Sequence, residues 1–220
     1  MFHVEQDFHG LWTRYQRTLH QRNAALKDEL QKGARHVWDE ELIETGEKLH
    51  AARAGLITRL HPLYQTCCQQ LLPEVRTVEL VLEPGWEDGG GFADALQRDQ
   101  ARDYARGFTH SGPQRADLQI RLDSRSSKQM ASHGQYKLLI VALRLAQILY
   151  LLESRKRSCC LLIDDLAAEL DVQHRARLSQ VLVGMPIQVF VTATESTLID
   201  RASWPTHKEF HVEHGEVKSL

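Results

Sequence analysis

The sequence has no long apolar run and no excess of charge of either sign. None of its hydrophobic stretches reaches the roughly 18 residues that a membrane-spanning helix needs, and the longest, around 138–152, is interrupted by Arg144 and Gln147. The first residues form neither the basic nor the apolar region of a secretory signal. A formal net charge of −2 argues against a surface coated with positive charge, although a local basic stripe is still allowed. We therefore expect a cytoplasmic protein that does not contact a membrane.

Cysteine is scarce, and its spacing does not suggest a metal site. The four cysteines form two adjacent pairs, 67–68 and 159–160, and neighbouring cysteines rarely bridge each other. We expect reduced thiols in or near a core. The histidines are scattered, and His207, His211 and His214 fall across an expected strand and turn, so we expect no metal site there.

Glycine and proline are rare between residues 8 and 72, where apolar residues recur at steps of three and four. This spacing is typical of amphipathic helices, and we expect two or three antiparallel helices with a break near Gly33. Basic residues on these helices indicate either a nucleic-acid-binding face or an ordinary solvated surface. They are Arg14, Arg17, Arg22 and Lys27.

After Pro73 the pattern changes to strands that alternate with helices. We expect strands at 75–82 and 118–122, separated by a loop at 84–91, a helix at 92–106 and a turn-rich segment at 109–115. The last hundred residues are expected to contain helices at 134–154 and 172–183, strands at 159–163 and 187–191, and a hairpin near 210–217. This order predicts an α/β fold with a largely parallel sheet.

The strongest chemical signal is an apolar strand that ends in two carboxylates, Leu161-Leu162-Ile163-Asp164-Asp165. Ligands gather at the carboxyl ends of parallel strands. In nucleotide hydrolases, the first acid at such a position can hold Mg²⁺ and the second can orient the attacking water. A strand that leaves the core at two acids is also common, so the motif alone leaves both interpretations open.

A second signal precedes the helix expected at 134–154. Ser132 and Gln135 have the spacing of a capping box, which by itself explains both residue types. A helix N-terminus with a hydroxyl and the close-approach glycine Gly134 is also an anion site, and could bind a γ-phosphate. Lys137 could add positive charge or only be solvated.

The order of these elements resembles that of ABC ATPases. The turn at 132–135 would be the signature motif, Asp164-Asp165 the end of Walker B, Asp171 the D-loop, and Thr192 or Thr194 the switch position. Longer stretches resemble the bacterial RecF family, and the helical opening resembles the arm that this family inserts into its ATPase head. These stretches are Gly112-Pro113-Gln114-Arg115-Ala116-Asp117-Leu118, Ser132-His133-Gly134-Gln135-Tyr136-Lys137-Leu138-Leu139, Ala142-Leu143-Arg144-Leu145-Ala146-Gln147 and Leu162-Ile163-Asp164-Asp165-Leu166-Ala167-Ala168-Glu169-Leu170-Asp171.

The resemblance implies a partial ABC-ATPase head, with a mainly parallel sheet flanked by helices, and an α-helical arm. Residues 1–74 would form the first part of the arm, 75–117 its remainder, and 118–220 the C-terminal part of the head. It further implies an ATP-dependent homodimer that binds duplex DNA near single-strand gaps. Such a protein would act in replication, recombination, gap repair and the SOS response, and would cooperate with RecO and RecR in loading RecA.

The resemblance also implies roles for single residues. Ser132, Gly134 and Gln135, with Lys137 nearby, would contact the γ-phosphate of ATP on the opposing head. Asp164 would bind Mg²⁺, and Asp165 would be the catalytic carboxylate. Arg14, Arg17 and Arg22 are the candidate DNA contacts, and Arg115 lies in a family motif whose role the residues do not define. Three departures from the usual ABC pattern, His133, Ala193 and the short Asp165, favour slow, switch-like hydrolysis.

The phosphate-binding Walker A sequence G-x-x-x-x-G-K-[ST] is absent. The glycine cluster at 85–91 has no lysine and contains two acids that would repel phosphate. We therefore expect the C-terminal part of a longer protein or a truncated gene product, with weak ATPase activity only when a Walker A-bearing N-terminal segment completes it. A non-catalytic protein-interaction module, or a remnant that cannot bind ATP alone, is the alternative.

Overall fold

The computed structural model describes residues 7–28, 36–87, 90–123, 125–127, 131–155, 158–166, 170–199 and 203–219. The chain divides into two compact units. Unit 1 comprises residues 1–65 and 77–130, and unit 2 comprises residues 66–76 and 131–220.

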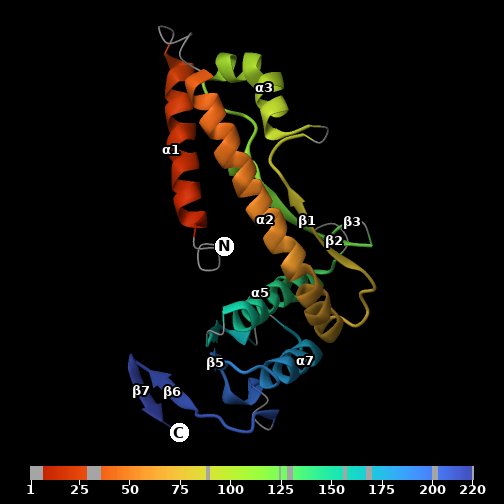
Figure 1. Cartoon of the computed structure of the whole chain (residues 1–220). Helices are drawn as coiled ribbons and strands as arrows, with labels where there is room; N and C mark the ends of the chain where they lie inside the picture. The colour runs from red at the N-terminus through yellow and green to blue at the C-terminus, as the bar shows by residue number, and fades with distance from the viewer. Residues whose placement is uncertain are drawn as a thin grey trace. The chain divides into compact units, whose positions relative to one another are not determined.

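Unit 1 is built on two long helices, α1 (Phe8–Lys27) and α2 (His36–Leu71), the second of which continues into unit 2. Figure 1 shows them side by side and antiparallel, as the sequence predicted. The predicted break at Gly33 lies outside the described residues. Helix α3 (Phe92–Arg106) supplies further core side chains. The core cluster consists of Phe8, Tyr15, Leu19, Leu42, Leu49, Phe92 and Leu96.

An antiparallel sheet completes unit 1. Strands β1 (Val78–Glu83) and β2 (Asp117–Leu122) pair over their full length, from Val78 with Leu122 to Glu83 with Asp117. The two-residue strand β3 (Arg125–Ser126) adds to β2. This pairing places β2 in unit 1, whereas the sequence interpretation began the C-terminal head at residue 118. The boundary differs because β2 finds its hydrogen-bonding partner 34 or more residues earlier in the chain, which strand alternation alone does not reveal.

Unit 2 contains the α/β part of the chain, and the predicted elements are observed to within about two residues. They are α5 (His133–Arg155), β4 (Cys160–Ile163), α7 (Val172–Val183), β5 (Gln188–Val191), and the hairpin of β6 (Phe210–Glu213) and β7 (Glu216–Ser219). Two short 3-10 turns, Pro113–Arg115 in unit 1 and Ser196–Leu198 in unit 2, are also present. The mixed α/β class is confirmed. Among the described strands, only β4 and β5 pair in parallel.

The cysteines differ from one another in their surroundings. Cys67 and Cys68 are buried on the last turns of α2, as expected, and burial raises the pKa of the Cys67 thiol to about 11. Cys160 is exposed on β4, so the expectation of a core thiol is wrong for this residue. It occupies the face of the two-stranded sheet that also exposes Leu162 and Phe190.

Candidate functional site

The Asp164 carboxylate, the Thr192 hydroxyl and the backbone of Asp165 meet at the carboxyl ends of β4 and β5. The Thr192 hydroxyl donates to Asp164 Oδ1 at 2.6 Å and accepts from the backbone N–H of Asp165 at 2.9 Å. Because β4 and β5 are parallel neighbours, the residues that follow each strand emerge at the same edge. The sequence prediction that Asp164, Asp165 and Thr192 share one site is consistent with these contacts.

The backbone holds this arrangement in place. Thr192 N–H donates to the carbonyl of Ile163 at 2.9 Å, and Leu166 N–H donates to the carbonyl of Thr192 at 3.3 Å. Asp165 has a φ of 46°, in the left-handed region that non-glycine residues seldom occupy. Strained conformations of this kind gather at functional sites, where the surrounding structure maintains them. Thr194 is exposed, and no hydrogen bond of its side chain is found within the described part of the chain.

The beginning of α5 has the capping box that the sequence predicted. Ser132 Oγ accepts from the backbone N–H of Gln135 at 3.2 Å, and Gln135 Oε1 accepts from the N–H of Ser132 at 3.0 Å. A Cβ added at Gly134 would meet no atom within 4 Å. Packing within the described residues therefore does not require glycine here, and the space beside the helix end is open. Lys137 is half-buried in the first turns of the same helix.

Asp171 caps α7. Its Oδ1 accepts from the backbone N–H of His174 at 2.9 Å, and its Oδ2 lies 2.7 Å from His174 Nδ1. These hydrogen bonds, the one from the His174 backbone foremost, lower the pKa of the Asp171 carboxyl. A helix cap is enough to explain this residue locally, so its proposed D-loop role depends on the resemblance alone.

The three candidate DNA-contacting arginines differ in exposure. Arg22 does not fit the prediction, because its side chain is 4% exposed and pairs with Asp39 and Asp103, each at 2.7 Å. Arg14 is exposed but forms an ion pair with Glu41 at 2.7 Å. Arg17 is exposed. Helical spacing placed all three on α1 but could not distinguish the buried position from the surface ones.

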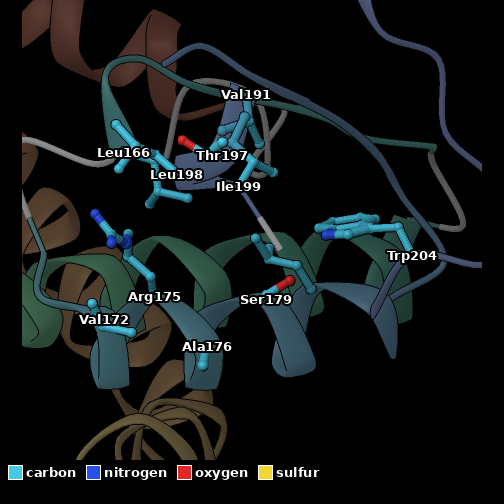
Figure 2. Close-up of a pocket in the computed structure, with 11 residues that line it drawn as sticks. Leu166, Val172, Arg175, Ala176, Ser179, Val191, Thr197, Leu198, Ile199 and Trp204 are labelled. Atoms are coloured by element: carbon cyan, nitrogen blue, oxygen red, sulfur yellow. The ribbon is translucent and has the colours of Figure 1, made fainter. Parts of the chain in front are cut away.

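A cavity that the sequence did not reveal lies in unit 2. Its volume is about 570 Å³. Figure 2 shows Val172, Arg175 and Ser179 of α7 on one side, Leu166 and Leu198 on the other. One lining residue, Leu166, directly follows the two carboxylates in the sequence.

The carboxylates at the strand ends are suitable ligands for Mg²⁺, but other groups would have to fill most of the coordination shell of the ion. Mg²⁺ is usually held by one or two carboxylates and completed by water and phosphate oxygens. Asp164 and Asp165 supply such carboxylates, and Asp164 keeps one oxygen that does not contact Thr192. Among the described residues, no group of three or more His, Cys, Asp or Glu side chains could hold a metal ion by itself.

Comparison with known proteins identifies close sequence relatives. No protein-family model matches the chain. The DNA replication and repair protein RecF of Thioalkalivibrio sulfidiphilus is 41% identical over 217 residues, which is 99% of this chain and 60% of that protein. RecF of Pasteurella multocida is 38% identical over 220 residues, and RecF of Coxiella burnetii is 39% identical over 221, each across the whole chain and 61% of the relative. The chain thus spans about three fifths of the length of these relatives.

A solved structure gives the same result for the fold. The structure of the recombination mediator protein RecF with ATP, from the RecFOR pathway, matches with a TM-score of 0.78 over 99% of this chain and 59% of that chain. At 20% identity, this likeness supports the fold alone. No helix among the described residues is long and apolar enough to cross a membrane. Over its whole length, the chain is homologous to the C-terminal part of RecF, a DNA replication and repair protein.

Proposed function

We propose that the chain provides the signature and Walker B half of an ATP-dependent DNA-binding protein that acts in DNA replication and gap repair. The observation that carries this proposal is the hydrogen-bonded set of Asp164, Asp165 and Thr192 at the ends of two parallel strands. Its carboxylates are suited to Mg²⁺ and to the orientation of an attacking water. The resemblance to RecF, and the ATP named in the related structure, supply the nucleotide.

In this proposal, ATP binds between two copies of the head. Ser132, Gly134 and Gln135, assisted by Lys137, contact the γ-phosphate bound to the opposing head. The open space around Gly134 and the exposed N-terminus of α5 support this role. Asp164 binds Mg²⁺ and Asp165 orients water, while Asp171 and either Thr192 or Thr194 complete the D-loop and switch positions. The chain lacks the lysine and backbone cradle of a P-loop, so a Walker A-bearing segment must supply them.

The partners in this proposal are duplex DNA near single-strand gaps and the RecO and RecR proteins, with loading of RecA as the outcome. Arg17 is an exposed DNA contact on α1. Arg14 reaches DNA only by exchanging its ion pair with Glu41, and Arg22 is withdrawn from the DNA face because it is buried. An exposed ion pair contributes little stability, and breaking the pair between Arg14 and Glu41 therefore costs little free energy.

Sedimentation velocity of the chain joined to a Walker A-bearing segment tests the ATP-dependent dimer. Addition of ATP and Mg²⁺ is expected to convert monomer to dimer, and Ser132→Arg is expected to abolish this conversion. Ser154→Arg introduces the same change near the other end of α5 and should leave dimerisation intact. Asp165→Asn should dimerise but hydrolyse ATP about a hundredfold more slowly, in the range typical of a lost catalytic base.

The two arginine variants also separate the proposal from its alternative. Equal loss of dimer in Ser132→Arg and Ser154→Arg would contradict a specific role for the helix tip. Binding of RecO or RecR without any nucleotide, by a form that never dimerises, would favour the interaction module instead.

A further inference from the structure

The loop that contains the Gly112-Pro113-Gln114-Arg115 motif is fixed from several sides. The N–H of Gly112 donates to the carbonyl of Gly85 at 2.9 Å, and Arg53 of α2 donates to the carbonyl of Pro113 at 2.6 Å. The side chain of Gln114 accepts a hydrogen bond from the hydroxyl of Tyr15, which is fully buried on α1. Two helices and a second loop therefore hold the motif, although it forms no long regular element.

A buried polar network holds the start of the same loop. Asp103 of α3 has no exposed surface, and its carboxylate pairs with Arg22 at 2.7 Å and with His110 Nδ1 at 2.8 Å. Its Oδ1 also accepts from the backbone N–H of His110 at 2.9 Å. Asn23 Oδ1 accepts from the backbone N–H of Thr109 at 2.8 Å. A fully hydrogen-bonded buried network of this kind makes the local backbone rigid.

Arg115, at the end of this rigid loop, is exposed. Its guanidinium carbon lies 5.8 Å from the centre of the Phe108 ring, and Phe108 stacks on His110 at 4.1 Å. Among the described residues Arg115 forms no ion pair. An arginine that is oriented by its support but left without a counter-charge is typical of residues that meet a ligand.

Arg115 lines a cavity of about 470 Å³ together with two arginines of α3, Arg98 and Arg102. Both are exposed, lie one turn apart, and form no ion pair within the described part of the chain. Three exposed guanidinium groups thus surround one cavity of unit 1. The volume falls within the range of ordinary ligand sites.

Three carboxylates also line this cavity, but two of them already accept hydrogen bonds. Asp99 accepts from the hydroxyl of Ser111 at 2.5 Å, and Glu83 accepts from the side-chain amide of Gln119. Both are half-buried, whereas Glu87 is exposed. The lining therefore carries three guanidinium groups and three carboxylates, and all three guanidinium groups but only one carboxylate are exposed, so an anion that enters the cavity meets mainly the arginines.

We infer that this cavity is a phosphate-binding site, in which Arg102 and Arg115 contact phosphate oxygens and Arg98 adds positive charge. The planar guanidinium fork matches phosphate geometry and forms strong, charge-assisted hydrogen bonds. If the phosphate belongs to a nucleic-acid backbone, the inference assigns a contact site to the proposed DNA-binding function and rests on that function. Free phosphate compounds present the same phosphate oxygens and are the second class of ligand that this site would accept.

The experiment compares Arg102→Gln and Arg115→Gln with Arg106→Gln in the whole chain. Arg106 is an exposed arginine at the end of α3 that does not line the cavity, so its variant removes the same charge outside the site. One arm measures the affinity for a fluorescein-labelled gapped duplex by anisotropy over a series of salt concentrations. The other arm measures binding of sodium pyrophosphate by calorimetry. Thermal melting by circular dichroism confirms that each variant folds.

If the phosphate is part of DNA, each cavity variant weakens DNA binding about tenfold and lowers the salt slope by about one, whereas Arg106→Gln changes affinity less than about twofold. If pyrophosphate binding is lost only in the cavity variants, the phosphate site stands. Absence of DNA binding in all forms would then contradict the proposed DNA-binding function, whereas DNA binding that is unchanged in the variants would place DNA outside the cavity. Equal losses in all three variants, or no binding of either probe, overturn the inference.

Discussion

Thr192 is the residue that joins the Asp164 carboxylate to the backbone of Asp165. Thr192→Val keeps the shape of the side chain but removes the hydroxyl that joins Asp164 to the Asp165 backbone. We expect unit 2 to lose about 1 kcal/mol or less of unfolding free energy, because both hydrogen bonds are exposed to solvent. Urea unfolding followed by circular dichroism measures this change.

Thr194→Val is the matched control for this prediction. Thr194 is exposed and its side chain forms no hydrogen bond with the described residues, so its replacement should stay within about 0.5 kcal/mol of the parent. Equal effects at the two positions would mean that the Thr192 hydroxyl does not stabilise the link between Asp164 and the Asp165 backbone.

The arginines of α1 show that residue type and helical spacing do not reveal whether a side chain is buried. Arg14, Arg17 and Arg22 have the same side chain and lie within two and a half turns of α1. Two acids distant in sequence, Asp39 of α2 and Asp103 of α3, distinguish Arg22. Burial opposes the charge of Arg22, but the hydrogen bonds to these two carboxylates outweigh it and raise the pKa of the guanidinium. Because Arg22 stays charged at every ordinary pH, the network that fixes the motif loop does not titrate through this residue.

At the scale of elements, two loops of unit 1 touch through glycines. Gly85 has a φ of 93°, and a Cβ there would lie 2.7 Å from the backbone nitrogen of Ala116 and nearer still to the carbonyl of Gly112. We expect Gly85→Ala to lower the unfolding free energy by at least about 2 kcal/mol, because it combines a left-handed backbone with a backbone clash. Denaturant unfolding with circular dichroism provides the measurement.

Gly10→Ala serves as the control. Gly10 lies in the first turn of α1, and an added Cβ meets nothing within 4 Å. Alanine favours the helix there by up to about 1 kcal/mol. A loss of stability at Gly10 comparable with that at Gly85 would indicate a general sensitivity to the change rather than contact between the loops.

At the scale of the whole molecule, the sheet of β4 and β5 exposes an apolar face. Leu162 is 73% exposed and Phe190 is 47% exposed, and the two are paired neighbours in the parallel register. Exposed apolar strands promote association between chains. We therefore expect Leu162→Lys combined with Phe190→Lys to raise the concentration at which the chain begins to aggregate, measured by static light scattering.

Lysines placed outside β4 and β5 separate the effect of changing this face from the effect of added positive charge. Val37 is 68% exposed on α2 in unit 1. Val37→Lys, even combined with a second lysine on an exposed helical position, should leave the aggregation threshold close to that of the parent. An equal rise from these control changes would show that net charge, and not the β4–β5 face, governs association.

The sequence by itself determined the order and bounds of the main elements, because helical and strand periodicities are local properties of the chain. Helices α3 and α7 begin and end at the predicted residues, and the capping box at Ser132 follows from two side chains three positions apart. The motif residues likewise identified the RecF resemblance. These features depend on neighbours within a turn or two, so they can be deduced without knowing the fold.

Only the tertiary structure decided which distant groups meet. It paired β2 with β1 in unit 1, joined Thr192 to Asp164, and buried Arg22 against Asp103. It also placed Arg115 beside a cavity lined by Arg98 and Arg102. Hydrogen bonds, ion pairs and cavities of this kind depend on the path of the chain in space, and residues far apart in sequence leave no local periodicity that would reveal them.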